Sequence, residues 1–174
     1  MYVMKLANLD SNLVVRTVPY ITQWFLVVLN DYFIWQIGKK TVGYNAARIG
    51  VVIFALNYFE NLHIHRCFTN SLEQILTVIA FHFYLKQGNR FTISTVLLTA
   101  LITIAFIGRN TSIVGWIPLL VIKVLYEGSL QPFIVSAITV AVPLMAGMVY
   151  IDTMYYGGDE WVLTSINFLK VNVL

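Results

Sequence analysis

The chain has 174 residues, of which 59% are hydrophobic and 11% are charged, and its formal net charge is +3. A soluble domain carries about 25% charged residues, so this composition excludes an ordinary soluble protein and predicts an integral membrane protein in a lipid bilayer. No basic cluster suggests a nucleic-acid partner, and the single cysteine, Cys67, cannot form an internal disulfide.

Six apolar runs follow one another along the chain. They cover residues 13–35, 46–59, 72–85, 91–107, 113–126 and 132–151. Lipid cannot satisfy free backbone amides, so spanning segments are helices or closed barrels, and these runs lack the alternation of barrel strands. The sequence therefore predicts an all-α fold, a polytopic transmembrane bundle of about six helices in a single membrane domain over residues 1–174. The stretch QIGKKTVGYN, residues 36–45, is predicted to be a loop.

Strict alternation of six spans places the connecting segments on two sides of the membrane. The basic loop residues of one side are Lys39, Lys40, Lys86 and Arg90. This side is assigned to the cytosol, because cytosolic loops carry an excess of Lys and Arg. The segments of the opposite side are approximately residues 1–12, 60–71, 108–112 and 152–174. Two charges in or near the runs, Asp31 and Lys123, are expected at cytosolic helix ends.

The stretch RCFTNSLE, residues 66–73, brings a cation, hydroxyls, an amide and a carboxylate to the non-cytosolic mouth of the third run. Thr69, Asn70 or Ser71 is the expected helix N-cap, and Asn70 with Glu73 has the spacing of a capping box. Capping does not explain Arg66, which suits an anionic head group or lipid phosphates in general. Both interpretations are open at this point.

The stretch GRNTS, residues 108–112, repeats this arrangement before the fifth run. Arg109 stands beside an expected cap at Thr111 or Ser112, and helix N-termini favour anions. Two such mouths on one side of the membrane suit a phosphate-bearing lipid substrate. The alternative is a pair of capped helices with interfacial arginines.

Metal and acid–base chemistry have weaker signals. His63 and His65 form an H-x-H pair without a third ligand nearby, so no metal site is expected. His82 lies inside the third run and is expected to pack against its neighbours. Asp159 and Glu160 are adjacent acids, which alone are weak evidence for a general base.

Three ordered motifs resemble a known family. The pattern R-x-x-[ST]-N-[ST]-x-E is matched over residues 66–73, and R-x-T-[SA] before W-[IL]-P is matched over residues 109–118. The pattern D-x-x-[FY]-[FY]-G followed by N-F-L-K-[FV]-N, the most specific of the three, is matched from Asp152 to Asn172. Together the motifs resemble glycosyltransferase family 22, the dolichol-phosphate-mannose-dependent mannosyltransferases of the GT-C membrane fold, and within it the members that act on GPI precursors.

This resemblance implies a function. The expected reaction transfers the third mannose, in an α-1,2 linkage, from dolichol-phosphate-mannose to the GPI-precursor glycolipid at the luminal face of the endoplasmic reticulum, without a cofactor. Arg66 and Arg109 are expected to hold the donor phosphate. The full set of implied substrate-binding residues is Arg66, Asn70, Glu73, Arg109, Asp152, Lys170 and Asn172. The resemblance does not indicate whether the enzyme needs a helper subunit.

The resemblance also implies a missing part. An inverting transfer needs a luminal carboxylate as general base, which this family is expected to carry in an H-x-D-E-like motif of a first luminal loop. The chain contains no such motif, so its catalytic residue is unknown and it is expected to be an internal piece of a longer enzyme. The alternative is an inactive membrane module that binds glycolipid or a partner enzyme. A channel or transporter ranks last, because the fourth run carries no charge.

Overall fold

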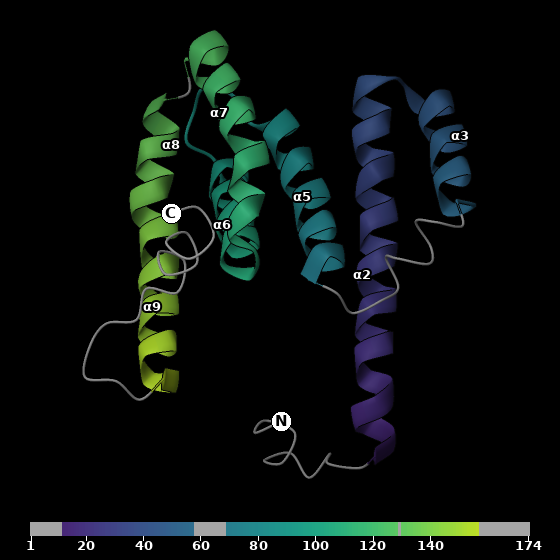
Figure 1. Cartoon of the computed structure of the whole chain (residues 1–174). Helices are drawn as coiled ribbons and strands as arrows, with labels where there is room; N and C mark the ends of the chain where they lie inside the picture. Colours follow the sequence, from purple (N-terminus) through teal and green to yellow (C-terminus); the bar gives the residue numbers. More distant parts are fainter. Residues whose placement is uncertain (1–11, 58–68, 129, 157–174) are drawn as a thin grey trace. The chain divides into compact units, whose positions relative to one another are not determined.

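The structure, a computed structural model, describes residues 12–57, 69–128 and 130–156 (Figure 1). No strand occurs among these residues. The elements are α2 (Asn12–Thr41), α3 (Tyr44–Ala55), α5 (Thr69–Lys86), α6 (Ile93–Gly108), the short 3-10 helix η1 (Asn110–Ser112), α7 (Ile113–Glu127), α8 (Leu130–Ser136), the π-helix turn η2 (Ala137–Ala141) and α9 (Val142–Tyr156). The chain divides into two compact units, Met1–Val78 and Ile79–Leu174.

The predicted all-α membrane fold is confirmed. Each of the six apolar runs corresponds to a helix, with α8, η2 and α9 forming one continuous helix, Leu130–Tyr156. This helix has 27 residues and contains a window of 18 residues with a mean hydropathy of 2.1, and among the described helices it alone meets both the length and the apolarity expected of a membrane span. At about 1.5 Å per residue it is about 40 Å long, which exceeds the roughly 30 Å of the hydrocarbon core.

The predicted loop over residues 36–45 is wrong, because α2 continues to Thr41 and α3 begins at Tyr44. Gly38 does not break α2. Instead it lets the two helices approach, since a Cβ built on Gly38 would lie 3.1 Å from the Cβ of Ala47. The turn itself is made by Gly43, whose φ of 92° is open to glycine and strained for other residues. Helices α2 and α3 therefore form a close hairpin.

Polar side chains are buried on one face of α2. Gln23, Val27 and Asn30, which follow each other at helical spacing, are all buried. The side chain of Asn30 is 0% exposed, and neither of its polar atoms has a hydrogen-bond partner within the described residues. The expectation that Asp31 lies at a helix end is wrong, because the longer α2 places it ten residues, about 15 Å, before Thr41.

The second unit has one apolar core. Ala80 of α5, Leu98 and Ile102 of α6 and Trp116 of α7 form its buried cluster. The hydroxyl of Tyr84 donates a hydrogen bond of 3.0 Å to the carbonyl oxygen of Leu119, which ties α5 to α7. The half-buried rings of the expected packing residue His82 and of Phe83 meet edge to face at 5.3 Å between centroids.

Lys123 lies one turn before the end of α7, as predicted, but its side chain is buried rather than extended toward water. It is 4% exposed, and its Nζ lies 3.0 Å from an oxygen of Glu127, which is 46% exposed. The ammonium also lies 4.5 Å from the ring centroid of Tyr84. Burying a charge is costly unless it is paired, and here a carboxylate and an aromatic face supply the pairing.

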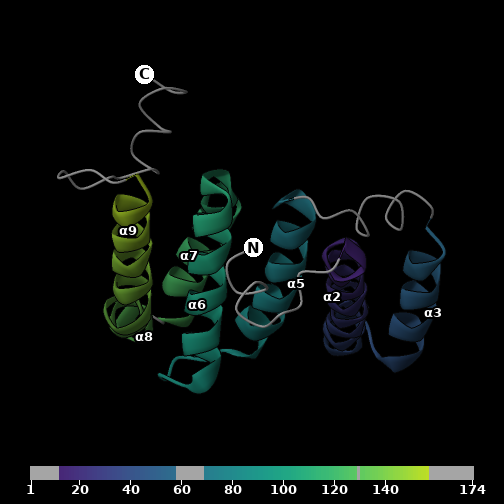
Figure 2. The same cartoon turned by 90° about the horizontal axis from the view of Figure 1, so that it is seen from below.

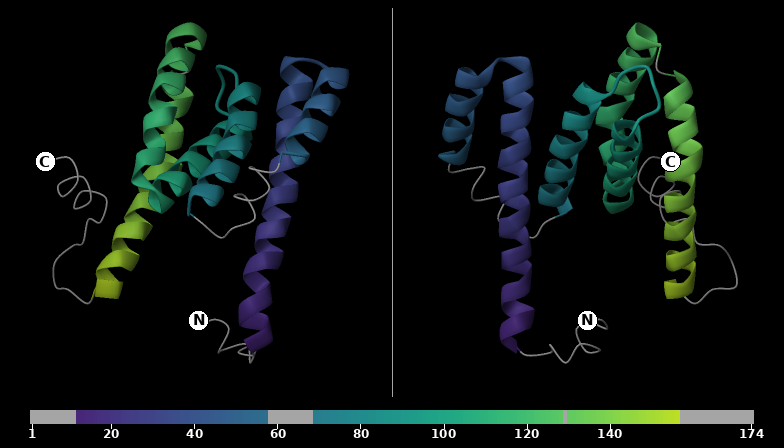
Figure 3. Two further views of the ribbon diagram at one scale, coloured as in Figure 1. Left: turned by 45° about the vertical axis from the view of Figure 1, so that its right-hand side comes forward. Right: turned by 180° about the vertical axis from the view of Figure 1, so that it is seen from behind.

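The long helix Leu130–Tyr156 changes winding in its middle. Val142 donates its amide hydrogen to the carbonyl of Ala137, five residues back, which is the π pattern of η2. Pro143 follows directly and has no amide hydrogen to donate, so a proline inside an apolar helix is accommodated by one widened turn. Figure 3 shows that the ribbon nevertheless continues through α8 and α9 as one rod. Pro132, expected in the first turn, is the third residue of α8.

Helix α6 and the helix α8–α9 run in the same direction. The hydroxyls of Thr99 and Ser136 lie 2.8 Å apart, and further along both helices Phe106 and Met145 line one cavity. Figure 2, seen from below, shows α8 and α9 end to end beside α6 and α7. The carboxyl ends of α6 and α9 therefore lie at the same end of this unit, as alternation requires of the fourth and sixth runs.

Candidate functional site

Arg109 lies at the junction between α6 and α7. Its backbone is extended, with φ −154° and ψ 109°, so it separates α6 from the short helix η1. Its amide donates to the carbonyl of Ala105 at 2.8 Å, and its own carbonyl accepts from Ser112 at 3.0 Å. Because both backbone groups are engaged, the junction is held while the guanidinium is exposed. The predicted position of this arginine at the mouth of the fifth helix is confirmed.

The predicted cap of α7 takes a different form. Ser112 does occupy the N-cap position, but its side chain makes no capping hydrogen bond because its backbone is helical, with φ −59° and ψ −31°. An N-cap normally has extended backbone angles that turn its oxygen toward the first amides. The Ser112 side chain is 7% exposed, and its Oγ has no hydrogen-bond partner within the described residues. Thr111 belongs to η1 and is exposed.

Asp152 lies in the last turns of α9, at the same end of the second unit as Arg109. The sequence predicted that the sixth helix stops at Ile151, whereas α9 continues to Tyr156 and includes this acid. Starting from the paired Thr99 and Ser136, Asp152 lies about six residues, roughly 9 Å, beyond the level of Arg109. Asp152 is half-buried. The structure thus brings these two predicted residues to one end of the unit.

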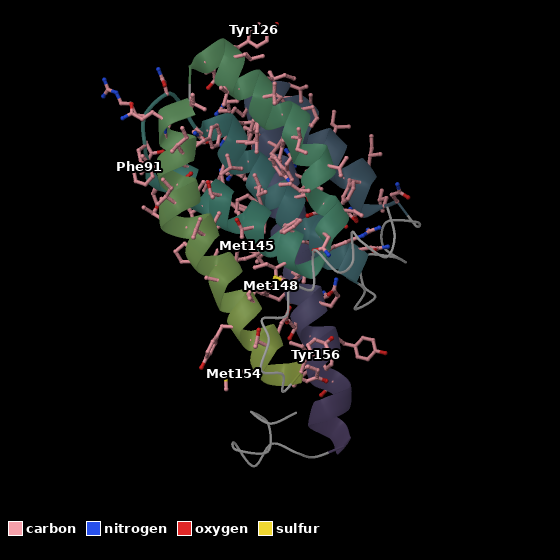
Figure 4. The ribbon with its side chains drawn as sticks, turned by 60° about the vertical axis from the view of Figure 1, so that its left-hand side comes forward. Phe91, Tyr126, Met145, Met148, Met154 and Tyr156 are labelled. Atoms are coloured by element: carbon pink, nitrogen blue, oxygen red, sulfur yellow. The ribbon has the colours of Figure 1, made fainter. Side chains whose placement is uncertain are left out.

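Aromatic side chains mark both ends of the second unit. Phe91 and Tyr126 lie at one end and Tyr156 with Met154 at the other, while Met145 and Met148 lie between them (Figure 4). Tyr126 is 85% exposed. Aromatic residues are enriched at the two membrane–water interfaces, and the orientation of this unit along the bilayer normal stays a prediction.

Asn70 and Glu73 lie in the first turns of α5. The helix begins at Thr69, so Asn70 is inside the helix and cannot be its N-cap as the predicted capping box requires. The cap position precedes Thr69 and lies outside the described residues. Asn70 is exposed and Glu73 is half-buried. Residues three apart share a helix face, so the amide and the carboxylate remain neighbours.

Several predicted residues lie outside the part of the chain that the structure describes. They are Arg66, Lys170 and Asn172 of the implied substrate set, together with His63, His65, Asp159 and Glu160. Their assignments remain predictions. Within the described ranges, no group of three or more His, Cys, Asp or Glu side chains is placed to hold a metal ion.

Sequence reasoning missed the apolar cavities that lie along the long helix in the second unit. One cavity of about 200 Å³ is lined by Phe106 of α6, Ile113 of α7 and Met145 of α9, among others. Phe106 and Ile113 are the near neighbours of Arg109 on either side in the sequence. No residue pattern predicts such a cavity, because its existence depends on how three helices pack together. The arrangement combines an exposed cation, an acid and an adjoining apolar cavity, which suits an amphiphile with an anionic head.

Known proteins similar to this chain support the motif prediction. The model of the Alg9-like mannosyltransferase family matches residues 1–174. The chain is 29% identical over 178 residues to GPI alpha-1,2-mannosyltransferase 3 of Homo sapiens, and 28% identical over 173 residues to the protein of the same name of Bos taurus. Each alignment covers 99% of this chain.

A fungal protein gives the same result. The chain is 27% identical over 172 residues to GPI mannosyltransferase 3 of Yarrowia lipolytica, with 98% of this chain aligned. The chain spans about a third of the length of these relatives, 31% for the two mammalian proteins and 33% for the fungal one. No solved structure matches it. Since the family model extends over the whole sequence, the chain belongs to the Alg9-like mannosyltransferase family.

Proposed function

We propose that this chain is a segment of a mannosyltransferase of GPI-anchor biosynthesis. The reaction transfers the third mannose, in an α-1,2 linkage, from dolichol-phosphate-mannose to the GPI precursor. It takes place at the luminal face of the endoplasmic reticulum, in a multi-pass membrane enzyme. The observation that carries this proposal is the alignment of 98–99% of the chain with relatives named for this activity.

The geometry of the second unit is compatible with a lipid-phosphate substrate. The exposed guanidinium of Arg109 stands at the amino end of η1 and α7, where helix amides and the helix dipole favour an anion. A charge-assisted hydrogen bond to phosphate is worth about 1.5–3 kcal/mol, or roughly ten- to a hundredfold in binding. Arg109 accordingly holds the phosphate of the donor as it becomes the leaving group.

The acids have a more limited role in this proposal. Asp152 lies at the same end of the unit as Arg109, where it can accept hydrogen bonds from sugar hydroxyls. Glu73 and Asn70 can do the same from the first turns of α5. None of these residues is assigned as the general base. That carboxylate is expected in a part of the enzyme that the resemblance places before this segment.

The test is complementation of cells that lack the third mannose of the GPI anchor. The chain, extended to the full length of its relatives, should restore surface GPI-anchored proteins, measured by flow cytometry, and a three-mannose glycan, measured by mass spectrometry. Arg109→Ala should reduce transfer about ten- to a hundredfold at equal protein level. Arg90→Ala, a second exposed arginine on the opposite predicted side, is the matched control and should leave transfer unchanged.

Each result has a defined reading. If the extended protein accumulates in the membrane but restores no third mannose, the proposed function is wrong. If Arg109→Ala transfers mannose at the unsubstituted rate, the phosphate assignment is wrong while the function stands. Glycolipid binding without transfer by the extended protein favours the alternative of an inactive binding module.

A further inference from the structure

The end of the first unit at which α2 passes into α3 is strongly basic. Three exposed cations, Lys39, Lys40 and Arg48, lie close together in the sequence at this end. The sequence contains no acidic residue from position 32 to position 59. Asp31, the nearest acid before them, lies eight residues, about 12 Å, before Lys39 along α2. We term the surface formed by the three cations the basic tip.

Aromatic contacts hold the two helices of the basic tip together. The rings of Trp35 in α2 and Tyr44 in α3 meet edge to face at 6.3 Å between centroids. The Nζ of Lys39 lies 5.1 Å from the ring centroid of Trp35. Gly38 approaches Ala47 on the neighbouring turns, and Figure 1 shows α2 and α3 side by side. The cations of both helices are therefore displayed at one place, among side chains that are typical of a membrane–water interface.

An apolar face of α3 adjoins the basic tip. Arg48 lies in the second turn of α3 and is the only charged residue of that helix. A cation on such a helix needs an anionic partner or water. The residues that follow on the same face are aliphatic and exposed by 62%, 53% and 65%, namely Ile49, Val52 and Ile53. Arg48 and these three residues line one depression. A guanidinium thus stands at the head of an exposed aliphatic row.

This combination favours a lipid over an acidic protein segment. An acidic segment in the aqueous phase would neutralise the basic tip and leave the aliphatic face of α3 uncovered. A phospholipid covers both, because its phosphate meets the cations and an acyl chain lies against the aliphatic row. A phospholipid with a net negative charge is preferred, since cations near a membrane surface attract anionic lipids and a zwitterionic head carries its own ammonium.

We propose that the basic tip and the adjoining face of α3 bind an anionic phospholipid of the leaflet on the predicted cytosolic side. Its phosphate lies among Lys39, Lys40 and Arg48, and one acyl chain lies along the face from Ile49 to Ile53. Each cation contributes about fivefold to binding, or about 1 kcal/mol. The site is built by α2 and α3 alone and does not depend on the proposed mannose transfer.

The first experiment compares two head groups on one photoreactive lipid. The 174-residue protein is placed in phosphatidylcholine nanodiscs with a trace of phosphatidylinositol or phosphatidylcholine that carries a diazirine in an acyl chain. Mass spectrometry of the digested protein locates the label. We expect the segment from Ile49 to Ile53 to be labelled at least about fivefold more by the anionic probe. Equal labelling by the two probes, or no label on this face of α3, overturns the proposal.

The second experiment removes the charge. Arg48→Gln should lower labelling by the anionic probe about fivefold and leave labelling by the zwitterionic probe unchanged, whereas Arg48→Lys should retain most of it. Arg90→Gln is the matched control, because Arg90 is also exposed and lies on the same predicted side of the membrane. It should leave the label on α3 unchanged. An equal loss in Arg90→Gln would mean that the lipid follows the general surface charge, which contradicts a site at the basic tip.

Competition separates the lipid from other sources of the same chemistry. Unlabelled phosphatidylinositol should displace the probe at least about tenfold better than glycerophosphoinositol, which has the same head and no acyl chain. Equal displacement would mean that the aliphatic face contributes nothing, and it contradicts the proposal.

A repeat in the protein extended to the length of its relatives tests whether protein covers this face instead. The same residues of α3 should be labelled, and loss of the label there would assign the face to a further helix and overturn the proposal. Labelling measures lipid binding and not mannose transfer, so its failure leaves the complementation test of the proposed function intact.

Discussion

The buried pair Lys123 and Glu127 leads to an asymmetric prediction. The ammonium is 4% exposed and contacts the carboxylate at 3.0 Å, while Glu127 itself is 46% exposed. Removing the carboxylate by Glu127→Gln leaves the buried cation over the Tyr84 ring without its counter-charge. Removing the cation by Lys123→Met leaves a carboxylate that water can solvate. The first substitution should therefore cost more than the second, although both break the same pair.

The magnitudes follow from burial. Taking one partner from a fully buried pair costs about 3–5 kcal/mol. Because Glu127 is nearly half exposed, solvent screening reduces this to about 1–3 kcal/mol for Glu127→Gln. Lys123→Met replaces a charge by an apolar chain of similar volume, which is often neutral, so the change in unfolding free energy should stay within about 1 kcal/mol. The double variant should match Lys123→Met alone, since Glu127 then has no partner to lose.

Reversible unfolding in mixed detergent micelles, followed by circular dichroism, measures all four proteins of this cycle. The expected coupling between the two positions equals the cost of Glu127→Gln, about 1–3 kcal/mol, which lies within the range of contacting residues. A larger loss for Lys123→Met than for Glu127→Gln would refute the reasoning, because it would mean that the buried charge stabilises the fold. Additive effects would equally refute it, because they would mean that the pair does not interact.

Two glycine substitutions test the backbone of each unit by the same unfolding measurement. Gly38→Leu should cost about 1–3 kcal/mol of unfolding free energy, because even a Cβ at this position lies 3.1 Å from the Cβ of Ala47. Gly50→Leu is the control and should be neutral or stabilising, because nothing lies within 4 Å of a Cβ there. Equal effects of the two substitutions would show that the α2–α3 hairpin is not close-packed. Gly128→Ala should cost about 1–2 kcal/mol of unfolding free energy, because the φ of Gly128 is +64°. Gly88→Ala is the control and should leave the unfolding free energy unchanged, because nothing lies within 4 Å of a Cβ at that position. A neutral Gly128→Ala would contradict the left-handed backbone at the end of α7.

The helices themselves were predictable from the sequence, because continuous apolar runs in a lipid environment have few alternatives to helix. The residues at which the helices begin and end were less predictable. Residues 36–45 contain two glycines and two lysines, which are typical of a loop. Gly38 instead lies inside α2 and packs closely against Ala47, a contact that depends on how α2 and α3 pair. The error at Asp31 has the same origin, since its position depends on where α2 ends.

The candidate site was predictable in part. The motif of residues 109–118 indicated an arginine at a helix mouth, and the structure places Arg109 there. The absence of a capping bond from Ser112 was not predictable, because it depends on backbone angles rather than on residue type. The cavity of about 200 Å³ was not predictable either, since its wall combines residues of α6, α7 and the long helix that lie far apart in the sequence.

In the multi-pass enzyme that we propose, the charge pair near the end of α7 would also set the depth of that helix in the bilayer. Glu127 reaches water and Lys123 is paired with Glu127. A shift of α7 by one turn toward the membrane centre would therefore carry both charges into the hydrocarbon. Helix α7 begins at Ile113, ten residues or about 15 Å before Lys123, and Arg109 precedes it across the short helix η1. In that arrangement the lysine near one end of α7 would fix the height of the arginine that precedes the other end, without contacting it.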